Sequence, residues 1–235
     1  ILISKIFCQK IITRSNSSSE GWSQNFIKKF IYKIFLKLSD QVIVNSYDFK
    51  KELDNKFSIN SIIIFNPLNK SEIQRKSKEK LRFNFYKNNK IKLITVGRLV
   101  DQKDQLTLLK AINLIKNINI QLLIIGDGEK KKNLINYLNK KKLSSIVKII
   151  SYKMNPYNYI KKSNIFILTS KFEGLPNVLL ETQALKKYII STNCPTGPRE
   201  ILLNGKAGDL IKIGDYKTLS KKILDYSSRN NKYKN

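Results

Sequence analysis

The segment IKLITVGRLVDQKDQLTLLKAINLI, residues 91–115, decides the fold, because its pattern indicates one strand, one turn and one helix. The apolar, β-branched run 91–96 predicts a strand, and Gly97 follows it directly. Asp104 is a residue type that caps helices, so the segment 104–115 is predicted to be helical. A strand that leads through a short turn into a helix is the unit from which parallel α/β sheets are built.

The same alternation extends along the chain on both sides of this unit. Strands are predicted at 10–13, 41–45, 61–65, 91–96, 120–125, 146–150, 165–169, 188–192 and 208–211. Helices are predicted at 24–38, 47–55, 104–115, 129–141, 156–162, 176–185 and 216–229. Apolar strands without strict alternation indicate sheets buried on both faces. The sequence therefore predicts an α/β protein with Rossmann-like, doubly wound parallel sheets.

One stretch, 69–90, interrupts this rhythm. It is rich in Lys, Asn and Glu, and it follows Asn66-Pro67, so we interpret it as an interdomain linker with a helical stretch. Residues 1–68 then form a partial domain of about three strands, and residues 91–235 a nearly complete one. Because the chain does not begin with Met, we expect the front of the first domain to be missing and the C-terminal end to be cut short.

The composition excludes several kinds of site. The chain has no histidine, which excludes a Ser-His-Asp triad, a Cys-His dyad and a His-based zinc site. Cys8 and Cys194 each stand alone, which is typical of a reducing compartment. No uncharged apolar run approaches the roughly 18 residues that a membrane-spanning helix needs. We therefore expect a cytoplasmic protein.

The net charge of +28 has three interpretations. In the first, codon bias has placed lysines on a solvated surface. In the second, the charge attracts anionic lipid or phosphate-bearing substrates. In the third, the partner is nucleic acid. The lysines are spread along the whole chain and no nucleic-acid-binding module is evident, so we expect no nucleic-acid partner.

Four segments carry chemistry. After the strand 91–96, Gly97 allows close approach of a ligand, and Arg98 and Lys103 place two cations at the carboxyl end of a strand. Two cations beside a helix N-terminus suit a diphosphate, although an ordinary turn with solvated charges has the same pattern. The second segment, IIGDGE (124–129), is a weak motif whose spacing favours a structural turn. It is not a dinucleotide-binding motif, because the first βα turn lacks the glycine triplet that such a site needs.

The third segment, FEGLPNVLLE (172–181), is the strongest. Pro176 suits the first turn of a helix, which leaves the following amides of residues 177–179 free to hold an anion. Glu173 and Glu181 bracket this helix start, and carboxylates accept hydrogen bonds from paired hydroxyls on sugars and ribose. A helix with a favourable acidic N-terminus is the simpler alternative.

The fourth segment, NCPTGPREI (193–201), predicts a stiff loop at the same end of the sheet. Arg199 and Glu200 either pair with each other there or line the cleft.

Taken together, these segments resemble glycosyltransferase family 4, a group of retaining enzymes with the GT-B fold of two Rossmann-like domains. The match consists of VGRL with QK, IIGDG, FEGLPNVLLE and CPTGPREIL, in this order. The spacing from Glu173 to Glu181 is the Glu-x7-Glu signature of that family. Upstream, DQVIVNS (40–46) and IIIFNPLN (62–69) are similar to the end of the family's acceptor domain.

The resemblance implies roles for individual residues. Arg98 and Lys103 would bind the diphosphate and stabilise the departing nucleotide, Glu173 would contact the transferred sugar, and Glu181 would hydrogen-bond the ribose. Segment 151–155 would lie against the base. The implied catalytic residues are Glu173, Arg98 and Lys103. The implied donor-binding residues are Gly97, Arg98, Lys103, Gly126, Gly128, Lys153, Met154, Glu173, Gly174, Leu175, Pro176, Asn177, Val178, Leu179 and Glu181.

The implied function is transfer, with retention, of a hexose or N-acetylhexosamine from a nucleotide diphosphate sugar, expected to be a UDP-sugar. The acceptor would be a glycan or a lipid-linked saccharide, as in bacterial members that build surface glycans. We expect no cofactor and no metal ion at the active centre. The alternatives are a catalytically inactive nucleotide-binding fragment or module and, less favoured, a basic nucleic-acid-binding protein.

The predicted helix 24–38 bears on localisation. An apolar stripe is formed by Phe26, Ile27, Phe30, Ile31, Ile34, Phe35 and Leu38, with Lys28, Lys29, Lys33 and Lys37 lying off it. Such a helix packs on a sheet or docks on an anionic membrane surface, the inner membrane face in this case.

Overall fold

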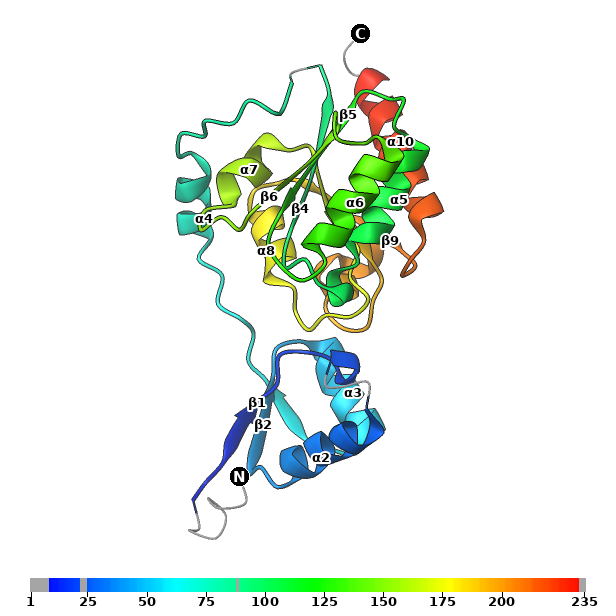
Figure 1. Cartoon of the computed structure of the whole chain (residues 1–235). Coiled ribbons are helices and arrows are strands. Elements are labelled where there is room, and N and C mark those ends of the chain that lie inside the picture. The colour runs from blue at the N-terminus through cyan, green and yellow to red at the C-terminus, as the bar shows by residue number, and fades with distance from the viewer. Residues whose placement is uncertain (1–8, 22–24, 88, 233–235) are drawn as a thin grey trace.

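The computed structural model describes residues 9–21, 25–87 and 89–232, and it shows two parallel sheets with helices around them (Figure 1). The smaller sheet has the strand order β1-β2-β3, with β1 (Ile12–Arg14), β2 (Gln41–Val44) and β3 (Ser61–Ile63). The fold is therefore α/β with parallel sheets, as the sequence predicted.

The larger sheet has the strand order β6-β5-β4-β7-β8-β9, and all its pairs are parallel. Its strands are β4 (Ile91–Val96), β5 (Ile120–Ile125), β6 (Val147–Ile150), β7 (Ile165–Leu168), β8 (Tyr188–Thr192) and β9 (Asp209–Ile211). Along the chain, the strands are added from β4 in the middle of the sheet outward to β6. The next strand, β7, lies on the other side of β4, and β8 and β9 follow outward from it. This doubly wound order creates a switch point between β4 and β7, beside which ligands bind in open α/β sheets.

Helices cover both faces of the larger sheet. One face carries α5 (Gln105–Leu114), α6 (Lys131–Lys141) and α10 (Tyr216–Lys232). The other carries α4 (Lys70–Ser77), α7 (Tyr157–Lys162), α8 (Asn177–Ala184) and α9 (Pro198–Ile201). Successive strand residues point to opposite faces, so Leu93 lies in the first core and Ile94 in the second, both without solvent exposure.

The smaller sheet has a core of its own. Its helices are α2 (Phe26–Lys37) and α3 (Tyr47–Phe57), and its core includes Val42, Val44, Phe49 and Leu53. Ser46 caps α3, because its hydroxyl accepts a hydrogen bond of 3.1 Å from the Phe49 amide. Three short 3-10 helices complete the described elements: η1 (Ser19–Gly21), η2 (Asp101–Lys103) and η3 (Leu203–Gly205).

Each predicted strand and helix has a counterpart in the structure, with ends shifted by a few residues. Residue 24, where the first predicted helix begins, lies outside the described residues, as does Cys8. The stretch 69–90, which we interpreted as a linker, contains the helix α4, which packs against α7 and α8. Asp104 caps α5 as predicted, accepting hydrogen bonds from the amide and hydroxyl of Thr107.

The prediction of a stiff loop over 193–201 was wrong in part, because Pro198–Ile201 forms α9. Gly197 supplies the positive φ of 85° that turns the chain into this helix, and Pro198 then stands at a first-turn position, where its missing N–H costs nothing.

The apolar stripe of α2 is largely exposed. Phe26 is 82% exposed and Ile27 64%, whereas Leu36 is the residue of this helix that is buried in the core of the smaller sheet. The helix therefore packs on its sheet through one edge and presents most of its stripe outward. Within the described ranges, the structure contains no helix with the length and hydrophobicity of a membrane span.

Candidate functional site

A cavity of about 670 Å³ lies at the carboxyl end of β4 and β7, beside the switch point of the larger sheet. It is lined by the turn after β4, the loop before α8, the first residues of α8 and the loop after β1. Its lining residues are Asn16, Ser17, Gly21, Val96, Gly97, Arg98, Gln102, Lys103, Phe172, Glu173, Gly174, Leu175, Pro176, Asn177, Val178 and Glu181. Its volume is within the usual range for small-molecule sites.

Lys103 and Glu173 form a buried ion pair in this cavity. The Lys103 Nζ lies 2.5 Å from Glu173 Oε1, and the two side chains are 16% and 8% exposed. An ammonium has three donors, so the pairing leaves Lys103 further donors for a ligand. The backbone on both sides is fixed, because the Lys103 carbonyl accepts from the Thr169 hydroxyl and the Glu173 carbonyl accepts from the Thr196 hydroxyl at 2.7 Å.

Arg98 lies on the exposed side of the same turn. Its Nη2 is 3.5 Å from Gln102 Oε1, while the Gln102 amide group donates to the Phe172 carbonyl at 2.9 Å. Gln102 therefore joins the cationic turn to the loop that carries Glu173. The arrangement places Arg98 and Lys103 on one cavity wall, as a site for a diphosphate requires.

The start of α8 forms the facing wall. Pro176 is the residue just before this helix rather than a member of its first turn. The Leu179 amide donates to the Pro176 carbonyl at 2.9 Å, so the prediction that it is free for an anion was wrong. Within the described residues, the amides of Asn177 and Val178 form no hydrogen bond to the protein, and both residues line the cavity.

Glu181 lies one turn further along α8 and is partly buried. Burial raises the pKa of its carboxyl above the ordinary value, and a hydrogen bond from Tyr157 offsets part of that rise. The Tyr157 hydroxyl is 3.3 Å from Glu181 Oε1, and burial together with this carboxylate raises the pKa of Tyr157 to about 12. Tyr157 is therefore a permanent donor that holds Glu181 in one orientation.

The glycines differ in what they accommodate. A Cβ at Gly97 would meet only the Lys103 side chain at 3.7 Å, so the protein's own packing leaves room there, on the cavity side. A Cβ at Gly126 would stand 1.9 Å from the Gly97 carbonyl, and one at Gly128 2.4 Å from the Leu99 carbonyl. Gly126 and Gly128 thus let two backbone turns pack together, which is the structural-turn interpretation of IIGDGE.

Some predicted site residues do not line the cavity. The cavity lining includes Gly97, Arg98, Lys103, Glu173, Gly174, Leu175, Pro176, Asn177, Val178 and Glu181. It does not include Gly126, Gly128, Lys153, Met154 and Leu179. Leu179 is fully buried in the core, whereas Met154 is 88% exposed.

The sequence-based interpretation missed the loop after β1. Ser17 forms an antiparallel bridge to Gly174, and the Ser18 amide donates to the Glu173 carbonyl at 3.1 Å. Asn66 reaches α8 as well, because its amide group donates to Asn177 Oδ1 at 2.7 Å. The available signal was SNSSSEG (15–21), a run of small residues directly after the first strand.

Arg199 and Glu200 do not pair with each other. Arg199 Nε donates to Asn193 Oδ1 at 3.1 Å, and Glu200 Oε2 accepts from the Asp48 amide at 3.2 Å. Glu200 therefore joins α9 to α3, and neither residue lines the cavity. In the described part of the chain, no group of three or more Asp, Glu or Cys side chains forms a candidate metal site.

The chain is similar in sequence and in fold to known glycosyltransferases. The sequence model of the family described as "Glycosyl transferases group 1" matches residues 77–235. An uncharacterised glycosyltransferase of Methanocaldococcus jannaschii is 34% identical over 218 residues, which cover 86% of this chain and 53% of that protein.

A second relative comes from Campylobacter jejuni and is named as the N-acetylgalactosamine-N,N'-diacetylbacillosaminyl-diphospho-undecaprenol 4-alpha-N-acetylgalactosaminyltransferase. It is 26% identical over 247 residues, covering 100% of this chain and 66% of the relative. Among solved structures, Anabaena HepE in complex with UDP-glucose superposes with a TM-score of 0.83 at 18% identity, over 98% of this chain and 66% of HepE. The chain thus spans between about half and two thirds of these proteins.

Proposed function

The chain belongs to the group 1 glycosyl transferases, and from this premise we propose that it transfers a sugar from a nucleotide diphosphate sugar, with UDP as the nucleotide. The transferred unit is a hexose or an N-acetylhexosamine, and the acceptor is a lipid-linked saccharide or a glycan of the cell surface. The observation that carries the proposal is the convergence of Arg98, Lys103, Glu173 and Glu181 on one cavity at the switch point.

The diphosphate lies between the cationic turn and the start of α8. Arg98 and Lys103 neutralise the charge that develops on the departing nucleotide, and the amides of Asn177 and Val178 add donors from the facing wall. These groups provide the positive charge without a metal ion or a cofactor. Gly97 keeps this part of the cavity open for the phosphates.

Glu173 faces the transferred sugar. Its Oε1 is occupied by Lys103, and its second oxygen forms no hydrogen bond to any described residue, so it is available to a sugar hydroxyl. In the proposed reaction the bond from the anomeric carbon to the diphosphate breaks, and the acceptor hydroxyl attacks from the same face. Its proton passes to the departing phosphate. The anomeric configuration is therefore retained without a protein nucleophile.

Glu181 accepts hydrogen bonds from the ribose hydroxyls, held in position by Tyr157. In this scheme residues 91–235 form the donor-binding domain, residues 69–90 the linker, and residues 1–68 part of the acceptor side. The contacts of Ser17 with Gly174 and of Asn66 with Asn177 bring the smaller sheet to the donor cavity.

A transfer assay tests the proposal. Purified protein is incubated in EDTA with radiolabelled UDP-hexoses and UDP-N-acetylhexosamines and with polyprenyl-diphosphate-linked saccharides, and the linkage of the product is read by NMR. We expect an α-linked product from an α-linked donor, and little product from Glu173→Gln. A β-linked product would refute retention, and UDP binding without any transfer would identify an inactive nucleotide-binding module.

We also propose that α2 docks on anionic lipid at the inner membrane face. Its exposed apolar stripe and its four lysines suit an interfacial helix. Vesicles that contain phosphatidylglycerol should bind the protein, and Phe26→Ser with Phe30→Ser should weaken this binding several-fold. Leu224→Ser, at an exposed apolar residue of α10, is the control. Equal effects of the two changes would contradict docking through α2.

A further inference from the structure

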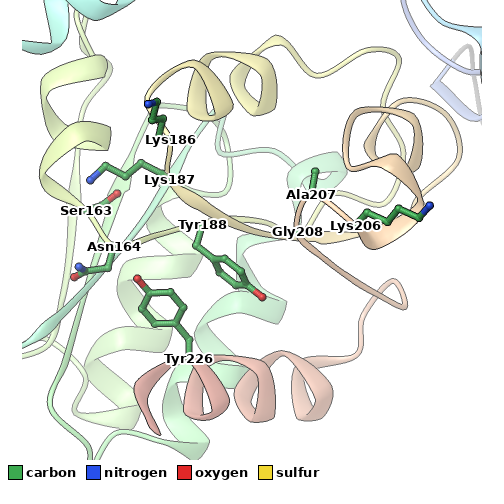
Figure 2. Close-up of a pocket in the computed structure, with 9 residues that line it drawn as sticks. All are labelled: Ser163, Asn164, Lys186, Lys187, Tyr188, Lys206, Ala207, Gly208 and Tyr226. Carbon is green, nitrogen blue, oxygen red and sulfur yellow. The ribbon is translucent and has the colours of Figure 1, made fainter. Parts of the chain in front are cut away.

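A second pocket of about 570 Å³ lies at the amino ends of the strands of the larger sheet, opposite the donor cavity (Figure 2). Three short segments that precede β7, β8 and β9 form it: residues 163–164, 186–187 and 206–208, with Tyr226 of α10 beside them. The donor cavity lies at the carboxyl ends of the strands and this pocket at their amino ends. Because β8 has five residues, the two sites are roughly 15 Å apart or more.

Three lysines line this pocket: Lys186, Lys187 and Lys206. Figure 2 shows Lys186 and Lys187 extending to the side on which Ser163 and Asn164 lie, while Lys206 points the other way. Among the described residues, none of the three lysines forms an ion pair. The nearby carboxylate of Asp209 is occupied by Lys222 and the Tyr188 hydroxyl.

Lys187 is the most informative of these residues. Its side chain is partly buried, and this desolvation, together with the charges of Lys161 and Lys92, lowers its pKa. The favourable interaction of a cation with a helix C-terminus explains Lys186, which lies two residues after the end of α8. This interaction does not explain Lys187, whose ammonium group is partly desolvated and is repelled by the charges of Lys161 and Lys92. A bound anion would remove this repulsion.

A neutral donor completes the arrangement. Asn164 Oδ1 accepts a hydrogen bond of 2.8 Å from the Lys92 amide, which leaves the Asn164 NH₂ group as a donor at the pocket. Two ammonium groups and an amide fit the oxygens of a phosphate. We propose that this pocket binds the phosphate group of a second ligand, separate from the sugar donor, through Lys186, Lys187 and Asn164.

The chain offers a matched pair of variants to test this site. Lys186 lies two residues after the end of α8 and Lys142 directly after the end of α6, and both have a φ of 54°, in the left-handed region that favours glycine. Lys186→Gly and Lys142→Gly therefore remove the same charge and relieve the same backbone conformation. Neither is expected to unfold the protein, which thermal denaturation verifies. Only Lys186 lines the pocket.

Equilibrium dialysis with radiolabelled inorganic phosphate gives the readout. We expect saturable binding that Lys186→Gly and Lys187→Gln weaken at least tenfold and that Lys142→Gly leaves unchanged. Phosphate in the donor cavity contributes equally to all variants, so failure of this site and failure of the proposed function remain distinguishable. In this arm, equal losses in Lys186→Gly and Lys142→Gly, or no loss in either, would exclude a soluble phosphorylated molecule as the ligand.

A second arm distinguishes the sources of the phosphate. Flotation with phosphatidylcholine vesicles that contain phosphatidic acid presents a phosphate group on a lipid, as a phosphomonoester. A specific loss for Lys186→Gly in this arm assigns the site to a lipid headgroup, and a specific loss in dialysis alone assigns it to a soluble phosphorylated molecule. No specific loss in either arm would refute the site.

Discussion

Lys103 Nζ contacts Glu173 Oε1 at 2.5 Å across the switch point, so one ion pair joins the turn after β4 to the loop before α8. Both side chains are largely buried, although each lies on a segment without regular structure beyond a 3-10 turn. The ion pair thus fixes the proposed phosphate-binding residue, Lys103, relative to the proposed sugar-binding residue, Glu173.

Lys103→Met should lower kcat by about 100-fold or more, because it removes positive charge from the leaving diphosphate. It should also destabilise the protein by about 3–5 kcal/mol, since Glu173 is left buried without its partner. Transfer kinetics and denaturant unfolding measure the two effects.

Lys171→Met is the control for this prediction. Lys171 pairs with Asp101 at 2.6 Å between the same two segments, but both side chains are exposed, so its loss should cost at most about 1 kcal/mol. If Lys171→Met reduced transfer as much as Lys103→Met, the assigned role of Lys103 would be wrong.

Tyr157→Phe should weaken UDP binding about three- to tenfold, because Glu181 loses the hydroxyl that orients it. The effect should disappear with a UDP analogue that lacks both ribose hydroxyls, since Glu181 then has nothing to accept from. Tyr137→Phe, on α6, should leave both affinities unchanged. Weakening of the same size for UDP and for the dideoxy analogue would argue against a positioning role.

Glu181 makes stability depend on pH. Burial raises the pKa of Glu181 in the folded protein above its pKa in the unfolded chain. The stability that the protonated carboxyl contributes is therefore fully present at a pH below the unfolded-state pKa. It is lost as the pH rises through the folded-state pKa. Glu181→Gln should therefore raise the melting temperature of the unliganded protein at pH 7 but not at pH 4. Asp225→Asn, at an exposed carboxylate of α10, should have no effect at either pH. A stabilisation by Glu181→Gln that is larger at pH 4 would contradict the assignment.

Alanine substitutions at Gly97 and Gly126 should affect ligand binding and stability differently. Gly97→Ala has room for its Cβ and should change stability by no more than about 0.5 kcal/mol while weakening UDP binding. Gly126→Ala forces a backbone contact of 1.9 Å and should destabilise the protein by several kcal/mol. Thermal unfolding and titration calorimetry check the pair. If Gly97→Ala destabilised the protein as strongly, the turn after β4 would be closed by its own packing.

The fold was predictable from the sequence because the buried strands are mostly apolar runs between clear turn signals. Ile120–Ile125 is fully buried, and its predicted bounds match the strand β5. The short helix α9 was harder to predict, because four residues flanked by Gly and Pro have the composition of a loop. Its formation depends on tertiary contacts such as that of Glu200 with the Asp48 amide.

The site was predictable where residues follow strand ends. Arg98, Lys103 and Glu173 stand just after the strands β4 and β7, and parallel strands place such residues at one edge. The contribution of Ser17 depends on how the smaller sheet meets the larger one, which no local pattern encodes. Tyr157 was missed because its partner lies 24 residues away on another helix.

Titration calorimetry with UDP tests the central claim most directly, because the claim is that the cavity beside the switch point holds a nucleoside diphosphate. We predict saturable binding of one UDP per chain that Arg98→Ala and Glu181→Ala each weaken at least tenfold and Lys37→Ala leaves unchanged. The absence of saturable binding, or equal effects of Glu181→Ala and Lys37→Ala, would contradict it.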